Sequence, residues 1–143
     1  MLPEIRISPS FYIALAVQIL LLPVNWIIAA IFSAAFHELS HLLVLQLCSV
    51  PVYRLQLHAF GAELDTSPME PSEELLCSLA GPAGSFLLML VIRWFPRIAI
   101  CALVQGLFNL LPIGKLDGSR VVHSAIHLLP RKSPCKRDKL GVQ

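Results

Sequence analysis

The feature that most constrains the fold is the near absence of charge in the first third of the chain. From Ile7 to Tyr53 the sequence carries one charged side chain, Glu38. This stretch is too long for one membrane span, since about 20 residues cross a bilayer. Pro23 supplies a break, because proline has no backbone donor for a helical hydrogen bond. We therefore expect two apolar helices, over residues 10–22 and 26–49.

The rest of the chain alternates apolar segments with short polar ones. Residues 52–60 show the period-two alternation that is typical of a strand. We expect the segments after the second helix in this order: a β element over about 52–62, an acidic loop up to residue 74, helices over 75–92 and 98–111, an irregular segment over 112–120, and a short amphipathic helix over 121–130.

These segments predict an all-α polytopic membrane protein with about four transmembrane or half-membrane helices and a short membrane-associated β element. We expect one intramembrane core over residues 1–130 and a basic C-terminal tail over 131–143. The composition agrees with this, because 56% of the residues are hydrophobic and 14% are charged. Soluble domains carry about 25% charged residues.

The charge distribution bears on partners and location. A formal net charge of +2 on so apolar a chain gives no indication of nucleic-acid binding. Because positive charge gathers on the cytoplasmic side of membrane proteins, we expect the basic tail to be cytoplasmic. The sequence thus predicts an integral multi-pass protein of the cell membrane, with the lipid bilayer as a partner.

A cluster of polar residues interrupts the second apolar helix. His37 and His41 are four residues apart, so their side chains share one face of a helix. With Glu38 they form an H-E-x-x-H pattern, in which two histidines hold zinc and the glutamate is a general base. An ionisable group in the bilayer costs about 2.5–3.5 kcal/mol on insertion scales. A metal ion with bound water would compensate the cluster.

A catalytic zinc site needs a third protein ligand and an open position. Asp117 is the leading candidate, because it follows two apolar segments and lies in the irregular segment. The remaining acidic candidates are in the polar loop, where solvated charges are the default: Glu63, Asp65, Glu70, Glu73 and Glu74. His123 and His127 form a second pair with the same spacing, but no glutamate stands between them, so we expect an ordinary surface pair.

Two motifs together resemble those of the site-2 protease family, zinc metalloproteases that cut inside membranes. The first is HELSH, His37 to His41, and the second is NLLPIGKLDG, Asn109 to Gly118, an N-x-x-P-x-x-x-x-D-G pattern. The segment AGPAGS matches the intervening G-P-x-x-N motif imperfectly, with Ser85 where the family has asparagine. Motif order and spacing agree over residues 26–125, and the chain looks most like the stage IV sporulation protein FB type.

This resemblance implies one Zn2+ per chain, held by His37, His41 and Asp117, with Glu38 activating a water molecule. It also implies that Asn109 lies beside the metal, where it orients substrate or the developing oxyanion. A purely structural role for Asn109 at the helix break carries equal weight. Finally, the resemblance implies that the strand over residues 52–60 pairs with an unwound substrate segment.

The sequence therefore predicts a zinc-dependent intramembrane endopeptidase. Its substrate would be a membrane-associated regulatory protein, cut in or near a transmembrane segment, and a regulatory membrane partner is a further expectation. One alternative is a membrane metallopeptidase with Glu73 or Glu74 as third ligand. Another is a catalytically silent membrane protein that binds substrate or partner helices, which the Ser85 departure and the short chain keep open.

Overall fold

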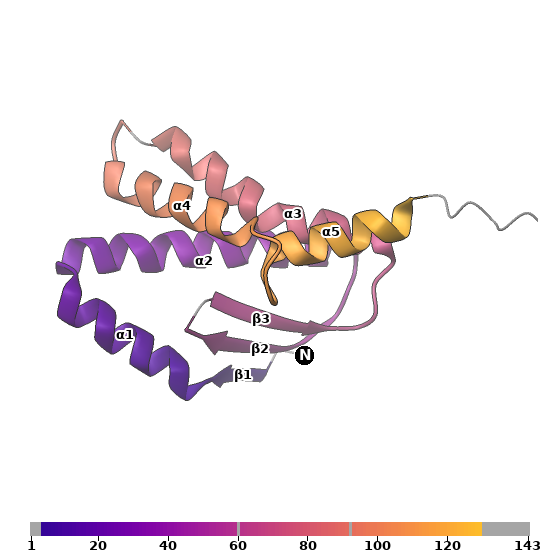
Figure 1. Cartoon of the computed structure of the whole chain (residues 1–143), viewed down its shortest axis with the longest axis horizontal. Coiled ribbons are helices and arrows are strands. Elements are labelled where there is room, and N and C mark those ends of the chain that lie inside the picture. The colour runs from indigo at the N-terminus through magenta and orange to yellow at the C-terminus, as the bar shows by residue number, and fades with distance from the viewer. Residues whose placement is uncertain (1–3, 60, 92, 130–143) are drawn as a thin grey trace, which may run out of the picture.

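The computed structural model describes residues 4–59, 61–91 and 93–129, so the predicted tail over 131–143 lies outside the described residues. Figure 1 shows the elements in this order: β1 (Glu4–Ile7), α1 (Pro9–Leu21), α2 (Val24–Leu47), β2 (Val52–His58), β3 (Gly61–Thr66), α3 (Pro71–Leu88), the 3-10 helix η1 (Met89–Val91), α4 (Pro96–Asn109) and α5 (Asp117–Leu128). Helix α2 crosses the middle of the molecule, with α3, α4 and α5 along one side and the sheet on the other.

The helices lie close to their predicted positions. Helix α2 begins directly after Pro23, the residue expected to break the long apolar stretch. Its end is marked by Ser49, whose left-handed φ of 58° turns the chain towards Pro51 and β2. The predicted helices over 10–22, 26–49, 75–92, 98–111 and 121–130 correspond, in order, to α1, α2, α3 with η1, α4 and α5.

The β element is larger than predicted. Its strands have the order β1-β2-β3, with β1 parallel and β3 antiparallel to β2. The predicted element over 52–62 covers β2 and the beginning of β3, but β1 is an additional strand that the all-α prediction missed. Gly61 makes the tight turn between β2 and β3, since its φ of 137° is accessible to glycine and strained for other residues.

The assignment of residues 62–66 to an acidic loop was wrong, because these residues form β3. Leu64 is buried and packs with Leu45 and Cys77 in the hydrophobic cluster under the sheet. The two charges that flank it are compensated, since Glu63 pairs with Lys115 and Asp65 with Arg54. Residues 62–66 therefore form a strand in spite of their polar composition, because Leu64 is buried and the flanking charges pair with residues of other elements.

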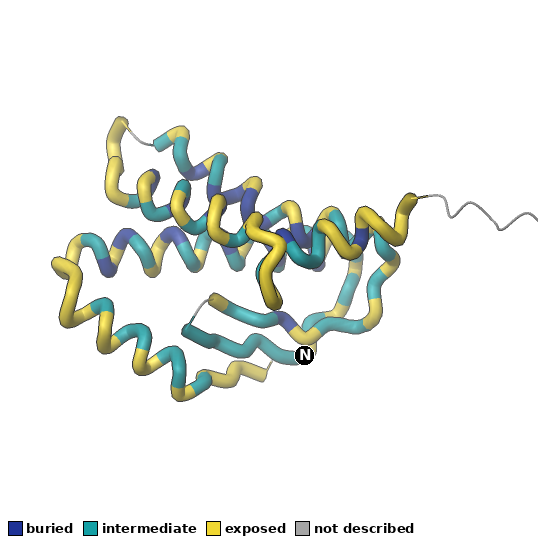
Figure 2. Tube along the Cα trace, in the orientation of Figure 1, coloured by how far each residue is buried: buried dark blue, intermediate teal, exposed yellow. Residues whose placement is uncertain are grey.

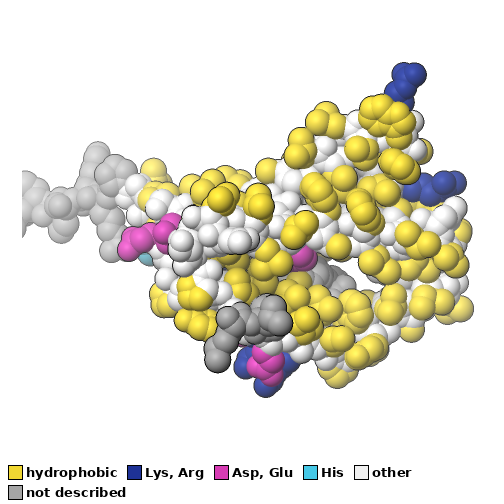
Figure 3. All heavy atoms as spheres, turned by 180° about the vertical axis from the view of Figure 1, so that it is seen from behind, with side chains coloured by type: hydrophobic (Ala, Val, Ile, Leu, Met, Phe, Trp, Pro, Cys, Tyr) yellow, Lys and Arg dark blue, Asp and Glu magenta, His cyan; other side chains and the backbone are white. Residues whose placement is uncertain are grey.

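Helix α2 buries polar side chains while it exposes apolar ones. Its buried face carries Ser33, His37 and His41 between the apolar Ile27, Ala29 and Leu45, and bulky apolar side chains cover its exposed face. Figure 2 shows buried positions where α2, α3 and α4 face one another, and Figure 3 shows hydrophobic side chains over much of the face that it presents. Buried polar groups beneath an apolar exterior are expected of a helix bundle in lipid.

Two described helices are long and apolar enough to cross a membrane, namely α2 and the 71–91 segment of α3 with η1. Helix α1 has 13 residues and α4 has 14, fewer than the about 20 that a full span needs. None of the residues of α1 is buried, and it diverges from α2 in Figure 1. Two helices of this length and hydropathy agree with a membrane protein, and the count of about four spanning or half-spanning helices stays a prediction.

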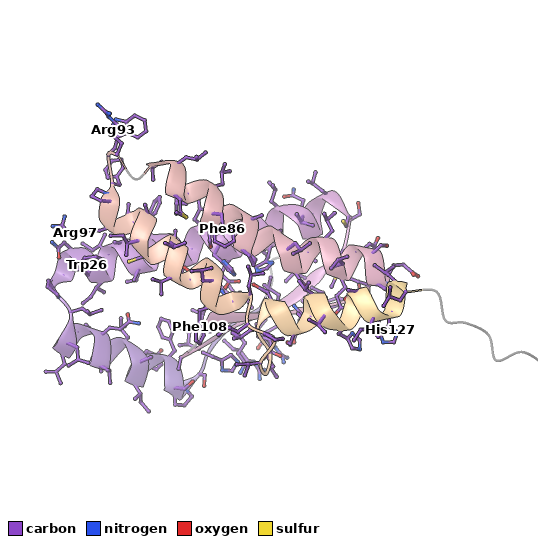
Figure 4. All side chains as sticks on the ribbon, turned by 45° about the horizontal axis from the view of Figure 1, so that its top comes forward. Trp26, Phe86, Arg93, Arg97, Phe108 and His127 are labelled. Atoms are coloured by element: carbon purple, nitrogen blue, oxygen red, sulfur yellow. The ribbon has the colours of Figure 1, made fainter. Side chains whose placement is uncertain are left out.

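Helices α4 and α5 follow one another along the same partner, α3. Helix α4 meets the C-terminal half of α3, where a Cβ on Gly106 would lie 3.1 Å from Cβ of Ser85. Helix α5 meets the N-terminal half, where Ser124 Oγ donates to Glu74 at 2.8 Å. Residues 110–116 interrupt the helical path between them. Figure 4 shows the two ends of this arrangement, with Trp26, Arg93 and Arg97 at one and His127 at the other.

Candidate metal centre

Three ligand atoms from two helices converge at the middle of the molecule. Nε2 of His37 lies 3.1 Å from Oδ2 of Asp117, Nε2 of His41 lies 3.3 Å from the same oxygen, and the two Nε2 atoms are 3.2 Å apart. The two histidines are buried and the Asp117 side chain is 13% exposed. Among the described residues these three form a group suited to hold a metal ion.

Helix α3 orients both imidazole rings. Nδ1 of His41 donates to the carbonyl oxygen of Cys77 at 2.8 Å, and because a carbonyl only accepts, this nitrogen carries the proton. Nδ1 of His37 lies 2.9 Å from the hydroxyl of Ser85, which is buried. Each ring therefore turns Nε2 towards Asp117. Such outer hydrogen bonds fix the tautomer of metal-binding histidines.

The donor set fits a metal ion. In neutral His41 the proton is on Nδ1, so Nε2 carries a lone pair. Nε2 and the carboxylate of Asp117 are then two acceptors that face each other with no proton between them. A cation resolves this conflict. Tetrahedral zinc has bonds of about 2.0 Å to nitrogen and oxygen, which places its ligand atoms about 3.3 Å apart. The three separations of 3.1, 3.2 and 3.3 Å agree with that spacing.

Gly81 leaves room at this centre. A Cβ at this position of α3 would overlap Nε2 of His41 and lie 2.6 Å from Nε2 of His37. Any other residue would thus fill the space against which the two ring nitrogens lie. Small residues allow helices to pack closely in lipid, and here Gly81 also gives the candidate ligands room.

Asp117 does not lie in irregular backbone as predicted, because it is the first residue of α5. The interruption ends one residue earlier, and the helix starts so close to the end of α4 that a Cβ on Gly118 would overlap the Leu110 carbonyl. This close approach brings the carboxylate from α5 to the histidines of α2. The irregular segment is thus needed to position Asp117, but it does not contain it.

Glu38 lies in a cavity of about 830 Å³ that reaches the centre. The cavity also includes His41, Asn109 and Asp117 in its lining. A Cβ on Gly61 would lie 3.9 Å from Oε1 of Glu38, so the start of β3 is close to this carboxylate. Glu38, the predicted general base, therefore lines the same cavity as His41 and Asp117, two of the three candidate ligands.

Asn109, the last residue of α4, also reaches the centre. Its Nδ2 donates to Nε2 of His37 at 3.0 Å, which agrees with a lone pair on that nitrogen. Its position beside the ligands is thus as expected, and its part in orienting substrate stays a prediction.

The other acidic candidates are engaged elsewhere. Glu70 and Glu73 form a capping box at the start of α3. Glu74 accepts a hydrogen bond from Ser124, and Glu63 and Asp65 make the ion pairs described above. A site with Glu73 or Glu74 as third ligand therefore has no support in the geometry. His123 and His127 pack ring against ring near the free end of α5, away from the centre.

Ser85 and the carbonyl of Cys77 are the partners that sequence reasoning missed. Ser85 attracted attention only as a departure from a family motif. The available signal for Ser85 was its spacing in the G-P-x-x-S segment. Ser85 follows Gly81 by four residues, so it lies one helical turn further along the same face of α3.

Comparison with solved structures finds a site-2 protease from Methanocaldococcus jannaschii, with a TM-score of 0.74 and 22% sequence identity. The alignment covers 85% of this chain and 66% of that chain, so the chain spans just under two thirds of the length of the protein it matches. The two share one fold. Scans against protein-family models and curated proteins find no match.

Proposed function

We propose that the chain is a zinc-dependent intramembrane endopeptidase of the site-2 protease family, similar to the stage IV sporulation protein FB type. The carrying observation is the convergence of His37, His41 and Asp117 from two helices, with Glu38 in the adjoining cavity. A shared fold with a site-2 protease supports the same assignment. The residues between 1 and 130 would form one intramembrane core.

One Zn2+ held by the two histidines and Asp117 would lower the pKa of water and polarise a peptide carbonyl. The carboxylate of Glu38 would take a proton from the attacking water and pass it to the leaving amine, as a general base and then a general acid. Asn109, beside His37, would donate its amide hydrogen to the substrate carbonyl or the developing oxyanion. Ser85 and Cys77 would keep both rings in the orientation that this chemistry needs.

The substrate would bind as an extended segment, because a helix hides its carbonyl groups in its own hydrogen bonds. The predicted partner for such a segment was the strand over 52–60. That prediction was wrong for β2, since both of its edges are paired, with β1 on one side and β3 on the other. Strand β3 is an edge strand of the described sheet, and it lines the cavity from Gly61 to Leu64. We therefore place the substrate against β3.

The membrane setting follows from the apolar exterior. Helices α2 and α3 would cross the bilayer, and α4 with α5 would form a third path interrupted beside Asp117. Lipid would then surround a multi-pass protein of the cell membrane, with the basic tail in the cytoplasm. The substrate would be a membrane-associated regulatory protein, and a membrane partner would control access to it.

The test is cleavage of fluorescently labelled casein by the detergent-purified chain. We expect slow cleavage by the wild type, loss of activity on zinc chelation and its return when zinc is added. Glu38→Gln should retain zinc and lose cleavage by at least about 100-fold. A matched control is Gln46→Glu, a charge change on an exposed position of the same helix.

Cleavage by Glu38→Gln at the wild-type rate would contradict this mechanism. A folded wild type that binds transmembrane partners but cuts neither casein nor those partners would instead favour the silent binding protein. The geometry around Ser85 weakens that alternative, because serine at this position still holds His37.

A further inference from the structure

The cavity beside the candidate metal centre has a basic wall that the proposed chemistry does not use. On one side the cavity is lined by β3, and on the other by residues 113–116 and the first turn of α5. Three basic side chains from three elements line it, namely His58, Lys115 and Arg120. Other residues engage these three side chains to different degrees.

Lys115 forms an ion pair with Glu63. Its Nζ lies 2.7 and 2.9 Å from the two carboxylate oxygens of Glu63. The carboxylate of Asp117 is shared between His37 and His41. Arg120 is partly buried, yet its guanidinium makes no ion pair and no side-chain hydrogen bond with the residues that the structure describes, Glu38 included. Its charge acts on Glu63 at longer range, but Lys115 already holds that carboxylate, so the guanidinium of Arg120 has no direct partner among the described residues.

The position of Arg120 makes this charge informative. It follows Asp117 by three residues on α5, and side chains three apart share one face of a helix. The guanidinium thus lines the same cavity one turn from the candidate ligand. A partly buried guanidinium that faces a cavity and has no ion pair or hydrogen bond keeps its donors free for an anion.

His58 lines the same cavity and also has a polar atom without a hydrogen-bond partner among the described residues. Nε2 of His58 is buried and has no hydrogen-bond partner within the described part of the chain, and the nearest carboxylate oxygen, Oε2 of Glu63, is 3.6 Å away. His58 is the last residue of β2, directly before the turn into β3. Polar groups are thus available at both sides of the space where an extended segment would lie along β3.

We propose that Arg120 binds the carboxylate of an Asp or Glu side chain in a peptide extended along β3, and so sets a preference for acidic residues near the scissile bond. This inference rests on the proposed function, because it takes the cavity as the peptide site. The planar guanidinium presents a fork of donors that matches a carboxylate with two parallel hydrogen bonds. A free peptide C-terminus has the same chemistry, and the experiment separates the two sources.

Binding is measured on the full chain in detergent with the Glu38→Gln substitution, so that no probe is cut. The probes are fluorescent ten-residue peptides of Ala, Val and Ser, blocked at both ends, with a central Glu, Gln or Lys. A fourth probe is the Gln peptide with a free C-terminal carboxylate. Fluorescence anisotropy then gives the affinity of each, at low and at high salt.

We expect the Glu peptide to bind at least about tenfold more tightly than the Gln peptide, since a hydrogen-bonded ion pair in a partly buried site is worth that much. The preference should shrink at high salt. Adding Arg120→Gln should equalise the Glu and Gln peptides. The matched control is Arg54→Gln, which removes an arginine that lies outside the cavity and should leave the preference intact.

Equal binding of the Glu and Gln peptides, or a Glu preference that survives Arg120→Gln, would overturn the proposal. Tight binding of only the free-carboxylate probe would assign Arg120 to a peptide C-terminus instead of a side chain. Cleavage of the Glu peptide by the wild type is followed in parallel. A Glu preference without cleavage would count against the proposed function and support the subsite, whereas cleavage without preference would do the opposite.

Discussion

The chain contains two histidine pairs with the same i, i+4 spacing, and the structure treats them differently. The ring centroids are 4.9 Å apart for His37 and His41 on α2, and 4.5 Å apart for His123 and His127 on α5. His37 is 1% exposed, whereas the side chain of His123 is 65% exposed. Spacing along a helix is thus common to both, and the surroundings decide which pair can act as a site.

Three surroundings distinguish the buried pair. Helix α3 supplies an acceptor for each Nδ1 atom, helix α5 supplies the carboxylate of Asp117, and Gly81 leaves the space between them open. Among the described residues, the exposed pair has only Glu74 within ion-pair distance, with 3.9 Å between Oε2 of Glu74 and Nδ1 of His123. A candidate metal site therefore depends on residues from several elements, and no one element contains all of them.

The largest expected effect is on zinc content. His41→Ala and Asp117→Ala should each reduce zinc affinity well beyond the 10–100-fold effect of an outer-shell change, because each removes a ligand. His123→Ala with His127→Ala should leave about one zinc per chain. Elemental analysis of the detergent-purified variants measures this. Equal losses from both pairs would remove the distinction drawn between them.

The next largest effect concerns the space at the buried pair. Gly81→Ala should abolish zinc binding, because the added Cβ overlaps Nε2 of His41. Ala83→Ser is the matched control at an exposed position of the same helix and should bind zinc normally. Circular dichroism of both variants shows whether the helices are kept. Normal zinc content in a folded Gly81→Ala chain would mean that the ring nitrogens lie elsewhere.

A smaller effect on zinc affinity is expected when Ser85, the hydrogen-bond partner of His37, is replaced. Ser85→Ala removes the hydrogen bond at Nδ1 and should weaken zinc binding about 10–100-fold. Ser85→Asn, which restores a polar side chain, should recover part of the loss. Competition with a chromophoric chelator gives the affinities. Unchanged affinity in Ser85→Ala would show that the ring is held by packing alone.

The smallest effect concerns the ion pair at the cavity of the buried pair. The hydrogen bond from Lys115 holds the pKa of Glu63 below its ordinary value of 4.5. A carboxyl whose pKa is lower in the folded state stabilises the fold above its ordinary pKa, and this contribution disappears as the pH falls through the folded value.

Glu63→Gln should therefore lower the thermal unfolding midpoint only slightly near pH 7, since exposed ion pairs contribute about 0–1 kcal/mol. The difference from the wild type should shrink as the pH falls below 4.5 and vanish once Glu63 is protonated in the folded state as well. Thermal scans in detergent over a series of pH values from 7 downwards check this. A difference that grows on acidification would reverse the sign that the lowered pKa requires.

Much of the helical fold is predictable because apolar length and proline are strong local signals. Pro23 separates α1 from α2, and the H-E-x-x-H spacing places both histidines on one face of α2. Asp117 could be singled out because few acidic residues follow apolar segments. The pairing of these residues depended on a motif resemblance, which local periodicity does not provide.

The remainder could not be predicted because it depends on contacts between elements distant in sequence. Strand β1 is recognisable only through its pairing with β2, 50 residues later in the case of Glu4 and Arg54. Strand β3 looked like a loop because its charges are compensated by Lys115 and Arg54. The Cys77 partner of His41 is a backbone carbonyl, which no residue type identifies, and the spacing of Ser85 from Gly81 gives its face on α3 but not the ring that it contacts.

The interruption between α4 and α5 also has a consequence for water. A helix that stops leaves its last carbonyls without donors, and the next helix begins with free N–H groups. Ser119 meets part of this need, with Oγ 2.8 and 2.7 Å from the carbonyl oxygens of Gly114 and Leu116. In an apolar surrounding, backbone groups of this break that find no partner in the chain would need water, and residues 113–117 line the cavity. Under the proposed function, the break in the backbone would thus bring water, a reactant of hydrolysis, close to Asp117.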